Sequence, residues 1–237
     1  MSVVIFLASD KAVRITSLMV KKYAIIVAGG SGSRMKSDIP KQFIEVEGLP
    51  ILMHTLKRFK EADSEMELIL ILPASQFDYW EMLCNKYPTV PHQLVEGGKT
   101  RFQSSLNGLQ VIDNEGLVAI HDGVRPFVSV DIINESFIVA AEKGTAIVSI
   151  PSKDSVRVNG KSIDRSTVRI IQTPQTFQIP LIKKAFETEE LSTFTDDASV
   201  AELAGFEINL IEGNYENIKI TTPEDLLWAE VILSKSF

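Results

Sequence analysis

Hydrophobic runs alternate along the chain with segments in which hydrophobic residues recur at helical spacing. Continuous apolar runs predict strands buried on both faces at residues 23–28, 67–72, 117–120 and 145–150, with a shorter strand at 207–212. Helices are predicted at residues 50–59, 104–112, 130–142, 180–188, 197–204 and from about 223 to 234. This alternation predicts an α/β fold with a mostly parallel central sheet, helices on both faces and right-handed crossovers.

Residues 152–171 break this rhythm. Apolar and polar residues alternate on both sides of Asn159-Gly160, which is a strong signal for a β-hairpin. We expect a β-arm that projects from the domain, and an exposed arm of this kind needs a cover such as a partner subunit.

Composition excludes several classes of protein. The 237 residues carry a formal net charge of −7, so the chain lacks the basic character of a nucleic-acid-binding protein. No apolar run reaches the roughly 18 residues of a membrane-spanning helix. The single cysteine, Cys84, excludes an internal disulfide, and the histidines at 54, 92 and 121 are too scattered to predict a zinc site.

The first 22 residues differ from the rest because they carry a net charge of +3. Their apolar stretch, residues 3–8, is short and no basic residue precedes it, so it does not resemble an export signal. We therefore expect a cytoplasmic protein. We treat residues 1–22 as an extension, either packed on the body or preceding a natural start at Met19, and residues 23–237 as one domain.

A glycine-rich loop follows the first predicted strand. It reads Ala28-Gly29-Gly30-Ser31-Gly32-Ser33-Arg34-Met35 and is followed by Pro40-Lys41-Gln42. Glycines let a backbone approach an anion closely, and the cations of Arg34 and Lys41 add fixed charge, so the loop predicts a phosphate site. The loop lacks the third glycine of a dinucleotide fingerprint and the Gly-Lys-Ser/Thr of a P-loop.

This loop resembles the signature of sugar-phosphate nucleotidyltransferases, and its Pro-Lys-Gln variant is similar to that of cytidylyltransferases. Four later segments agree with the resemblance: GGKTRFQS at 97–104, HDGVRP at 121–126, QTPQ at 172–175 and NIKITTPED at 217–225. Together the five segments resemble the 2-C-methyl-D-erythritol 4-phosphate cytidylyltransferase family from about residue 23 to the C-terminus.

The resemblance implies a Rossmann-like nucleotidyltransferase domain and transfer of the cytidylyl group of CTP to methylerythritol phosphate in the non-mevalonate isoprenoid pathway. Parts of the second and fourth of these later segments also occur in enzymes that use ribitol 5-phosphate, which is therefore the alternative substrate. A non-catalytic nucleotide-binding module is a further hypothesis, whereas the missing third glycine disfavours an NAD-dependent oxidoreductase.

The resemblance also implies roles for individual residues. Arg34 and Lys41 match the residues that stabilise the pentavalent phosphorus. The expected CTP-binding residues are Ala28, Gly29, Gly30, Ser31, Gly32, Gly97, Gly98, Arg101, Ser104 and Asp122. Arg165, reaching across from a partner subunit, and Lys219 match the residues that hold the alcohol phosphate. Ser155, Thr173, Thr195 and Asp196 match the polar groups around the alcohol.

A metal and a partner are implied as well. The resemblance places Asp122 near Mg²⁺, which we expect to be held largely by the CTP phosphates, since Mg²⁺ usually takes one or two carboxylates and keeps waters. Because Arg165 is expected to act across an interface, we predict a homodimer that forms through the β-arm. Arg125 either pairs with Asp122 or contacts substrate.

Overall fold

The computed structural model describes residues 20–30, 35 and 39–234 of the chain. Most of the predicted N-terminal extension, including Met19, lies outside these residues, so its treatment as a separate segment stays a prediction.

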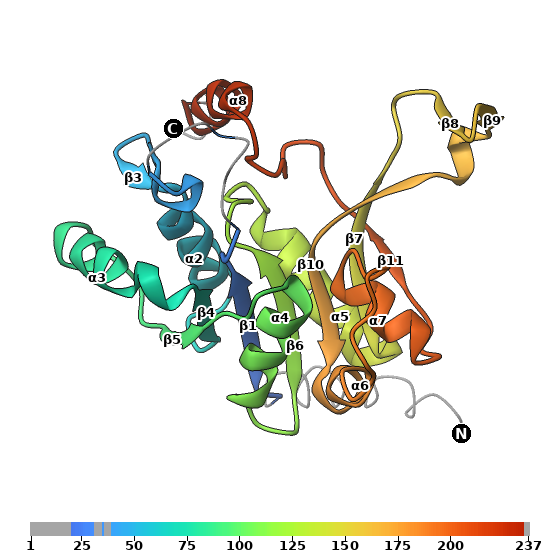
Figure 1. Ribbon diagram of the computed structural model, residues 1–237, viewed down its shortest axis with the longest axis horizontal. Helices are drawn as coiled ribbons and strands as arrows, with labels where there is room; N and C mark the ends of the chain where they lie inside the picture. The colour runs from blue at the N-terminus through green and yellow to red at the C-terminus, as the bar shows by residue number, and fades with distance from the viewer. Residues whose placement is uncertain (1–19, 31–34, 36–38, 235–237) are drawn as a thin grey trace, which may run out of the picture.

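A seven-stranded sheet forms the centre of the molecule, in the order β11-β7-β10-β6-β1-β4-β5 (Figure 1). The four predicted buried strands are confirmed as β1 (Lys22–Val27), β4 (Glu67–Leu72), β6 (Leu117–Asp122) and β7 (Thr145–Pro151). β1 lies parallel to both neighbours, with Tyr23 opposite Glu67 on β4 and Val118 on β6. The predicted strand at 207–212 is shorter, as β11 (Leu210–Glu212) at one edge. The sheet is therefore mostly parallel, as expected.

Two strands of this sheet were missed by the sequence pattern. β10 (Arg169–Gln178) runs antiparallel between β6 and β7, whereas the sequence analysis assigned residues 169–171 to the arm and predicted no strand after them. Proline rarely occurs inside a central strand. Here the ladder with β7 shifts register between Ile171 and Gln175, so Pro174 lies in an irregular stretch. β5 (Gln93–Glu96) escaped notice because it is a four-residue edge strand with polar ends.

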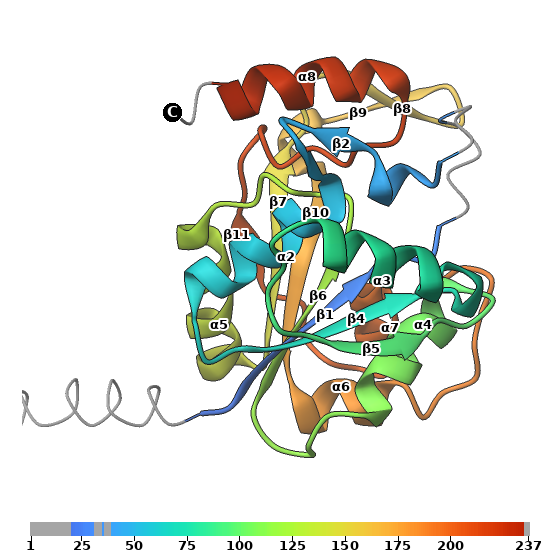
Figure 2. The same ribbon diagram turned by 90° about the vertical axis from the view of Figure 1, so that its left-hand side faces the viewer.

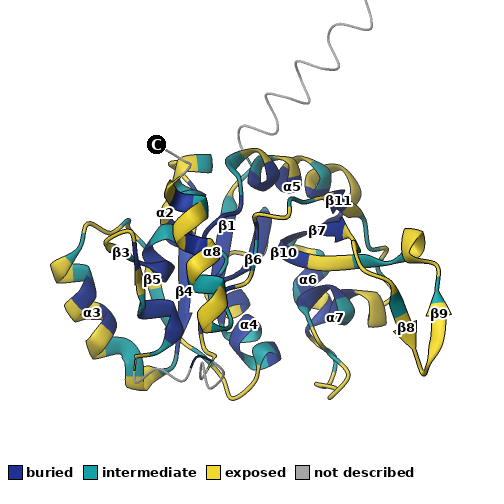
Figure 3. Cartoon of the chain, turned by 90° about the horizontal axis from the view of Figure 1, so that it is seen from above, coloured by how far each residue is buried: buried dark blue, intermediate teal, exposed yellow. Residues whose placement is uncertain are grey.

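Helices cover both faces of the sheet, because successive side chains of each buried strand point in opposite directions. Ile26 belongs to the apolar cluster under α2 (Ile51–Ala62), α3 (Phe77–Lys86) and α5 (Val130–Lys143). Ile25 belongs to the cluster under α4 (Arg101–Gln110), α6 (Ile179–Ala185) and α7 (Asp197–Leu203). Figure 3 shows the sheet buried between these layers.

The start of α4 corrects the predicted helix at 104–112. The helix begins three residues earlier, at Arg101, because Thr100 rather than Ser104 is its N-cap and accepts a hydrogen bond from the Gln103 backbone N–H. Ser104 lies inside the helix and is free to hold the preceding loop.

A third apolar cluster lies beyond the carboxyl ends of the central strands. There α8 (Pro223–Ser234) crosses above the short ribbon of β2 (Glu45–Val46) and β3 (Leu49–Pro50) (Figure 2). Ala229 and Leu233 of α8 pack with Val46, Ile51 and other buried residues. The 3₁₀ turn η2 (Lys41–Phe43) precedes this ribbon, whereas η3 (Ala74–Gln76) leads into α3.

The predicted arm is confirmed as a two-stranded hairpin, β8 (Val156–Val158) and β9 (Lys161–Ile163), which projects from the body (Figures 1 and 3). Asn159 and Gly160 both have positive φ, at 50° and 77°, as a two-residue type I′ turn requires. The 3₁₀ turn η4 (Arg165–Thr167) leads from the hairpin back toward β10. In the described part of the chain, no helix is long and apolar enough to cross a membrane.

Candidate active site

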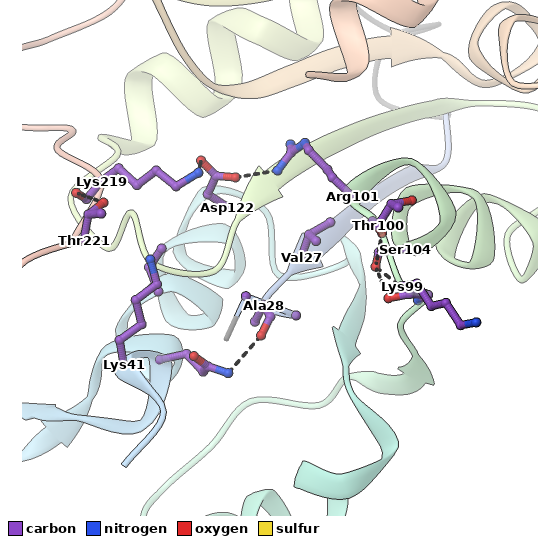
Figure 4. Close-up of a pocket in the computed structure, with 15 residues that line it drawn as sticks. Val27, Ala28, Lys41, Lys99, Thr100, Arg101, Ser104, Asp122, Lys219 and Thr221 are labelled. Atoms are coloured by element: carbon purple, nitrogen blue, oxygen red, sulfur yellow. Dashed lines mark hydrogen bonds and ion pairs between the residues drawn. The ribbon is translucent and has the colours of Figure 1, made fainter. Parts of the chain in front are cut away.

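A cavity of about 490 Å³ opens at the carboxyl ends of β1 and β6 (Figure 4). The chain adds β4 on one side of β1 and later adds β6 on the other side, so the order of the strands changes direction at β1. Open α/β sheets bind ligands at such a point. The predicted site residues that line it are Ala28, Gly29, Gly30, Lys41, Gly98, Arg101, Ser104, Asp122 and Lys219.

The glycine loop enters this cavity directly from β1. The Ala28 N–H donates to the Ile71 carbonyl at 2.9 Å, and Gln42 Nε2 donates to the Ala28 carbonyl at 2.9 Å. These bonds fix the backbone at the point where exposed Gly29 and Gly30 begin the loop. Ser31, Gly32 and Arg34 lie outside the described residues, so their roles remain predictions.

The second loop, before α4, is held by Ser104. Its hydroxyl accepts a hydrogen bond from the Gly98 N–H at 3.1 Å and donates to the Thr100 carbonyl at 2.8 Å. Gly97 lies behind the cavity wall, where its N–H donates to the Leu72 carbonyl. A Cβ at Gly98 would lie only 2.2 Å from Gln103 Cβ, so this tight approach requires glycine.

We expect Gly98→Ala to destabilise the free protein by about 1–3 kcal/mol, because the loop or the start of α4 must move to accept the methyl group. Gly30→Ala is the matched control, since among the described residues a Cβ there meets no atom within 4 Å. Urea denaturation without nucleotide measures both. Equal stabilities of the two variants would contradict the packing argument.

Asp122 is the centre of a cluster of charges on the cavity wall. Its side chain is 7% exposed and accepts from Arg101 at 2.6 Å, from Arg125 at 3.0 Å and from Lys219 at 3.1 Å. Burial alone would raise the pKa of Asp122, but the charges of Arg101, Lys219 and Arg125 outweigh it and hold the pKa far below its usual range. Asp122 is therefore an anion that keeps three cations at the site. The open question about Arg125 is answered in favour of pairing.

Arg101 joins this cluster to a second buried carboxylate. Its other terminal nitrogen donates to Asp197 at 2.7 Å, and Ser105 donates to the same carboxylate at 2.6 Å. Burial lowers the pKa of Arg101, but Asp197 and Asp122 raise it further than burial lowers it, so the guanidinium stays charged. One side chain thus ties α4 to β6 and α7. The sequence analysis missed Asp197, whose only signal was its position beside Asp196.

His121 supports Asp122 from inside the protein. The Asp122 N–H donates to Thr173 Oγ1, so the Thr173 hydroxyl can donate its own proton to His121 Nδ1. The proton of the neutral His121 ring is then on Nε2, which donates to the Arg125 carbonyl at 3.1 Å. His121 is fully buried, and burial lowers its pKa to about 3. The imidazole is therefore neutral and structural at neutral pH.

The buried histidine predicts a loss of stability in mild acid. The unfolded chain binds a proton at His121 below about pH 6.5, whereas the folded protein does not until near its own pKa of about 3. Folding free energy should fall by about 2 kcal/mol from this residue between pH 7 and pH 5. Urea denaturation of the metal-free protein at the two pH values measures it, and His121→Gln should reduce the difference; an unchanged difference would exclude His121 as its source.

A second cavity of about 250 Å³ adjoins the first. The two share Arg101, Asp122 and Lys219, so the charged cluster forms their common wall. The predicted residues Thr173, Thr195 and Asp196 line the second cavity, and so do residues that the sequence analysis did not assign: Ile171, Gln172 and Gln175. Gln175 fixes the position of Asp196 by donating to its carboxylate at 2.8 Å.

Two predicted residues lie apart from both cavities. Ser155 and Arg165 are exposed on the arm, where Arg165 donates to the Lys153 carbonyl at 3.1 Å. Tyr215 fixes the root of the arm, since its hydroxyl donates to the Pro151 carbonyl at 2.9 Å and its ring lies under the Lys153 ammonium. Within one chain these residues complete neither cavity, so their proposed action needs a second subunit.

The fold and these two cavities define an α/β nucleotidyltransferase. The chain belongs to the 2-C-methyl-D-erythritol 4-phosphate cytidylyltransferase family, whose model matches residues 22–235.

Individual proteins with this description are similar along most of the chain. The protein from Phocaeicola vulgatus is 46% identical over 217 residues, which are 90% of this chain and 99% of its own. That from Porphyromonas gingivalis is 46% identical over 220 residues, 90% and 98% of the two chains. The crystal structure of 4-diphosphocytidyl-2C-methyl-D-erythritol synthase from Anaerococcus prevotii matches with a TM-score of 0.77 at 32% identity, covering 91% and 96% of the chains.

Proposed function

We infer that the protein transfers the cytidylyl group of CTP to 2-C-methyl-D-erythritol 4-phosphate, giving CDP-methylerythritol and pyrophosphate in the non-mevalonate isoprenoid pathway. The observation that carries the inference is a pair of adjoining cavities with one cationic wall, in a chain of this family. The reaction brings two phosphate-bearing substrates together, and each cavity offers one of them a place.

The larger cavity suits the nucleotide. Glycines of the loop after β1 and of the Gly98 loop line it, so backbone forms part of its wall. We propose that a base pocket walled by backbone favours a pyrimidine over a larger purine. We propose that the phosphate of the alcohol attacks the α-phosphorus of CTP in line and that pyrophosphate leaves. Positioning and charge stabilisation carry most of such a reaction. We assign Lys41, together with Arg34, to the stabilisation of the additional negative charge in the transition state.

The smaller cavity suits the alcohol phosphate. Thr173, Thr195 and Asp196 offer hydrogen-bond partners to hydroxyl groups, and Lys219 offers a positive charge to the phosphate. The Lys219 ammonium lies on Asp122 at 3.1 Å at the boundary of the two cavities, close to where the substrates would meet. Ser155 and Arg165 would add to this cavity from the arm of a partner subunit.

The residues present fit a magnesium ion that arrives with the nucleotide. Asp122 offers one carboxylate to such an ion, and its oxygens also accept from three cationic side chains. The described residues form no cluster of three or more His, Cys, Asp or Glu side chains that could hold a metal without the nucleotide. Such an ion would take most ligands from the triphosphate and would neutralise part of its charge. Asp122 would hold it beside the cavity wall.

A homodimer formed through the β-arm completes the proposal. The hairpin is largely exposed on its own chain, and Arg165, in the turn that follows it, lines neither cavity. A two-fold interface would place the arm of each subunit against the other subunit's site. The cytoplasmic location expected from the sequence stays a prediction.

The direct test is pyrophosphate release by the purified protein with CTP and Mg²⁺. We expect release with 2-C-methyl-D-erythritol 4-phosphate and little with ribitol 5-phosphate. Release only with ribitol 5-phosphate would keep the CTP chemistry and change the pathway. CTP binding without release from either alcohol would support a non-catalytic module.

Action of Arg165 in trans predicts rescue between two inactive subunits. Arg165→Ala and Lys219→Ala should each weaken use of the alcohol phosphate, and mixed dimers should regain one intact site of the two. Tagged co-expression and purification of the mixed dimer measures this. Lys161→Ala, on the same exposed hairpin, is the control for the arm. Absence of rescue in a verified mixed dimer would show that the arm acts within its own chain or not at all.

A further inference from the structure

The wall of the smaller cavity contains a single side chain without a polar atom. Of the ten described residues that line it, nine carry nitrogen or oxygen in their side chains, and Ile171 is the exception. The nine are Arg101, Asp122, Arg125, Gln172, Thr173, Gln175, Thr195, Asp196 and Lys219. A wholly apolar side chain in such surroundings offers the largest hydrocarbon surface that a ligand's methyl group can contact.

The position of Ile171 follows from the irregularity of β10. Ile171 is opposite Ser149 of β7, and regular pairing resumes only at Gln175. In this irregular stretch Ile171 reaches the cavity and remains 37% exposed, instead of joining the apolar core. Its neighbour Ile170 is also exposed, at 47%, but does not line the cavity. Among the described residues that line the cavity, Ile171 therefore has the only wholly hydrocarbon side chain to offer to a bound alcohol.

The proposed substrate has one hydrocarbon feature that matches this surface. Methylerythritol phosphate carries a branch methyl group among its hydroxyl groups, whereas erythritol phosphate and ribitol phosphate carry no such branch. We propose that Ile171 contacts this methyl group and determines the preference of the enzyme for the branched alcohol. The inference rests on the proposed function and assigns one specificity residue within it.

The expected size of the preference follows from the size of the contact. One methyl or methylene group in an apolar pocket is worth about 10- to 200-fold in kcat/KM. The half-exposed surface of Ile171 places the expected preference toward the lower end of that range, at about 10-fold.

The test compares two alcohols that differ only in the methyl group. We would measure kcat/KM for methylerythritol 4-phosphate and for erythritol 4-phosphate with the wild type, Ile171→Val, Ile171→Thr and Ile170→Ala. Valine and threonine have nearly the same shape, so this pair isolates the polarity of the contact. We expect the preference to persist in Ile171→Val and Ile170→Ala and to fall toward equality in Ile171→Thr. A far-ultraviolet circular-dichroism spectrum of each variant reports that it is folded.

Each outcome decides the inference. Equal use of both alcohols by the wild type, or a preference that Ile171→Thr leaves unchanged, would overturn the role of Ile171 while the cytidylyltransferase function stands. Release from neither alcohol by the wild type would overturn the proposed function, and the inference with it. If turnover of erythritol 4-phosphate is too slow to measure, calorimetric binding of each alcohol phosphate beside an unreactive CTP analogue measures the part of the preference that arises in binding, which Ile171→Thr should reduce.

Discussion

Replacing Lys41 by Met is expected to lower kcat about 10²- to 10³-fold, as the loss of one preorganised donor to a transition state does. The Lys41 side chain lines the larger cavity, is 8% exposed and donates to the Ile220 carbonyl at 3.1 Å. A charge that is held in place before reaction stabilises a transition state without reorganising. We therefore expect CTP affinity to change much less than kcat. Arg34→Ala should act in the same direction if it shares this role.

Single-turnover kinetics and calorimetric CTP binding separate the two effects. Lys57→Met, which removes an exposed lysine from α2, should leave both unchanged. Lys41→Arg keeps the charge but changes its geometry, and we expect it to recover only part of the rate. A Lys41→Met variant whose loss appears in CTP affinity with kcat intact would assign Lys41 to nucleotide binding instead.

The second large effect is expected at Arg101. Arg101→Met removes one of the three cations that pair with Asp122. It also removes the only ion-pair partner that Asp197 has in the described part of the chain. Removing one member of a buried ion pair costs about 3–5 kcal/mol, because the remaining charge stays buried without compensation. Both cavities use Arg101, so activity should be lost together with stability.

A second substitution identifies the cause of that loss. Asp197→Asn in the Arg101→Met background removes the uncompensated charge and keeps a similar shape, so the double variant should be more stable than Arg101→Met alone. Lysine has one charged nitrogen and cannot bridge two carboxylates, so Arg101→Lys should remain impaired. Urea denaturation of the wild type, Arg101→Met, Asp197→Asn and the double variant measures the coupling. A double variant that is less stable than Arg101→Met would show that packing, and not charge, dominates.

The extent of prediction from sequence differs between local and long-range features. β1 and its glycine loop were predicted because a run of apolar residues followed by glycines is a pattern within consecutive residues. The Asn159-Gly160 turn was predicted for the same reason. β10 was missed because its polar and proline-containing centre is stabilised by β6 and β7, which lie far away in the sequence.

The site shows the same division. Asp122 was predicted as a site residue from the family resemblance, but the three cations around it come from positions 101, 125 and 219. Asp197 was missed because its part in the charge cluster comes from its ion pair with Arg101, which lies 96 residues away in the sequence. The start of α4 was wrong because two hydroxyl residues compete as caps, and only the fold shows that Thr100 has the capping geometry.

The arm leaves and re-enters the sheet at neighbouring points, because Pro151 of β7 is opposite Arg169 of β10. Residues can therefore be added to or removed from the arm without moving either strand, and each doubling of a flexible loop costs only about 0.6 kcal/mol in closure entropy. Any contacts that the arm makes with a second subunit could consequently diverge during evolution while the two cavities stay the same. For a designer, the same feature makes the arm a place where a new assembly partner could be introduced into an otherwise unchanged enzyme.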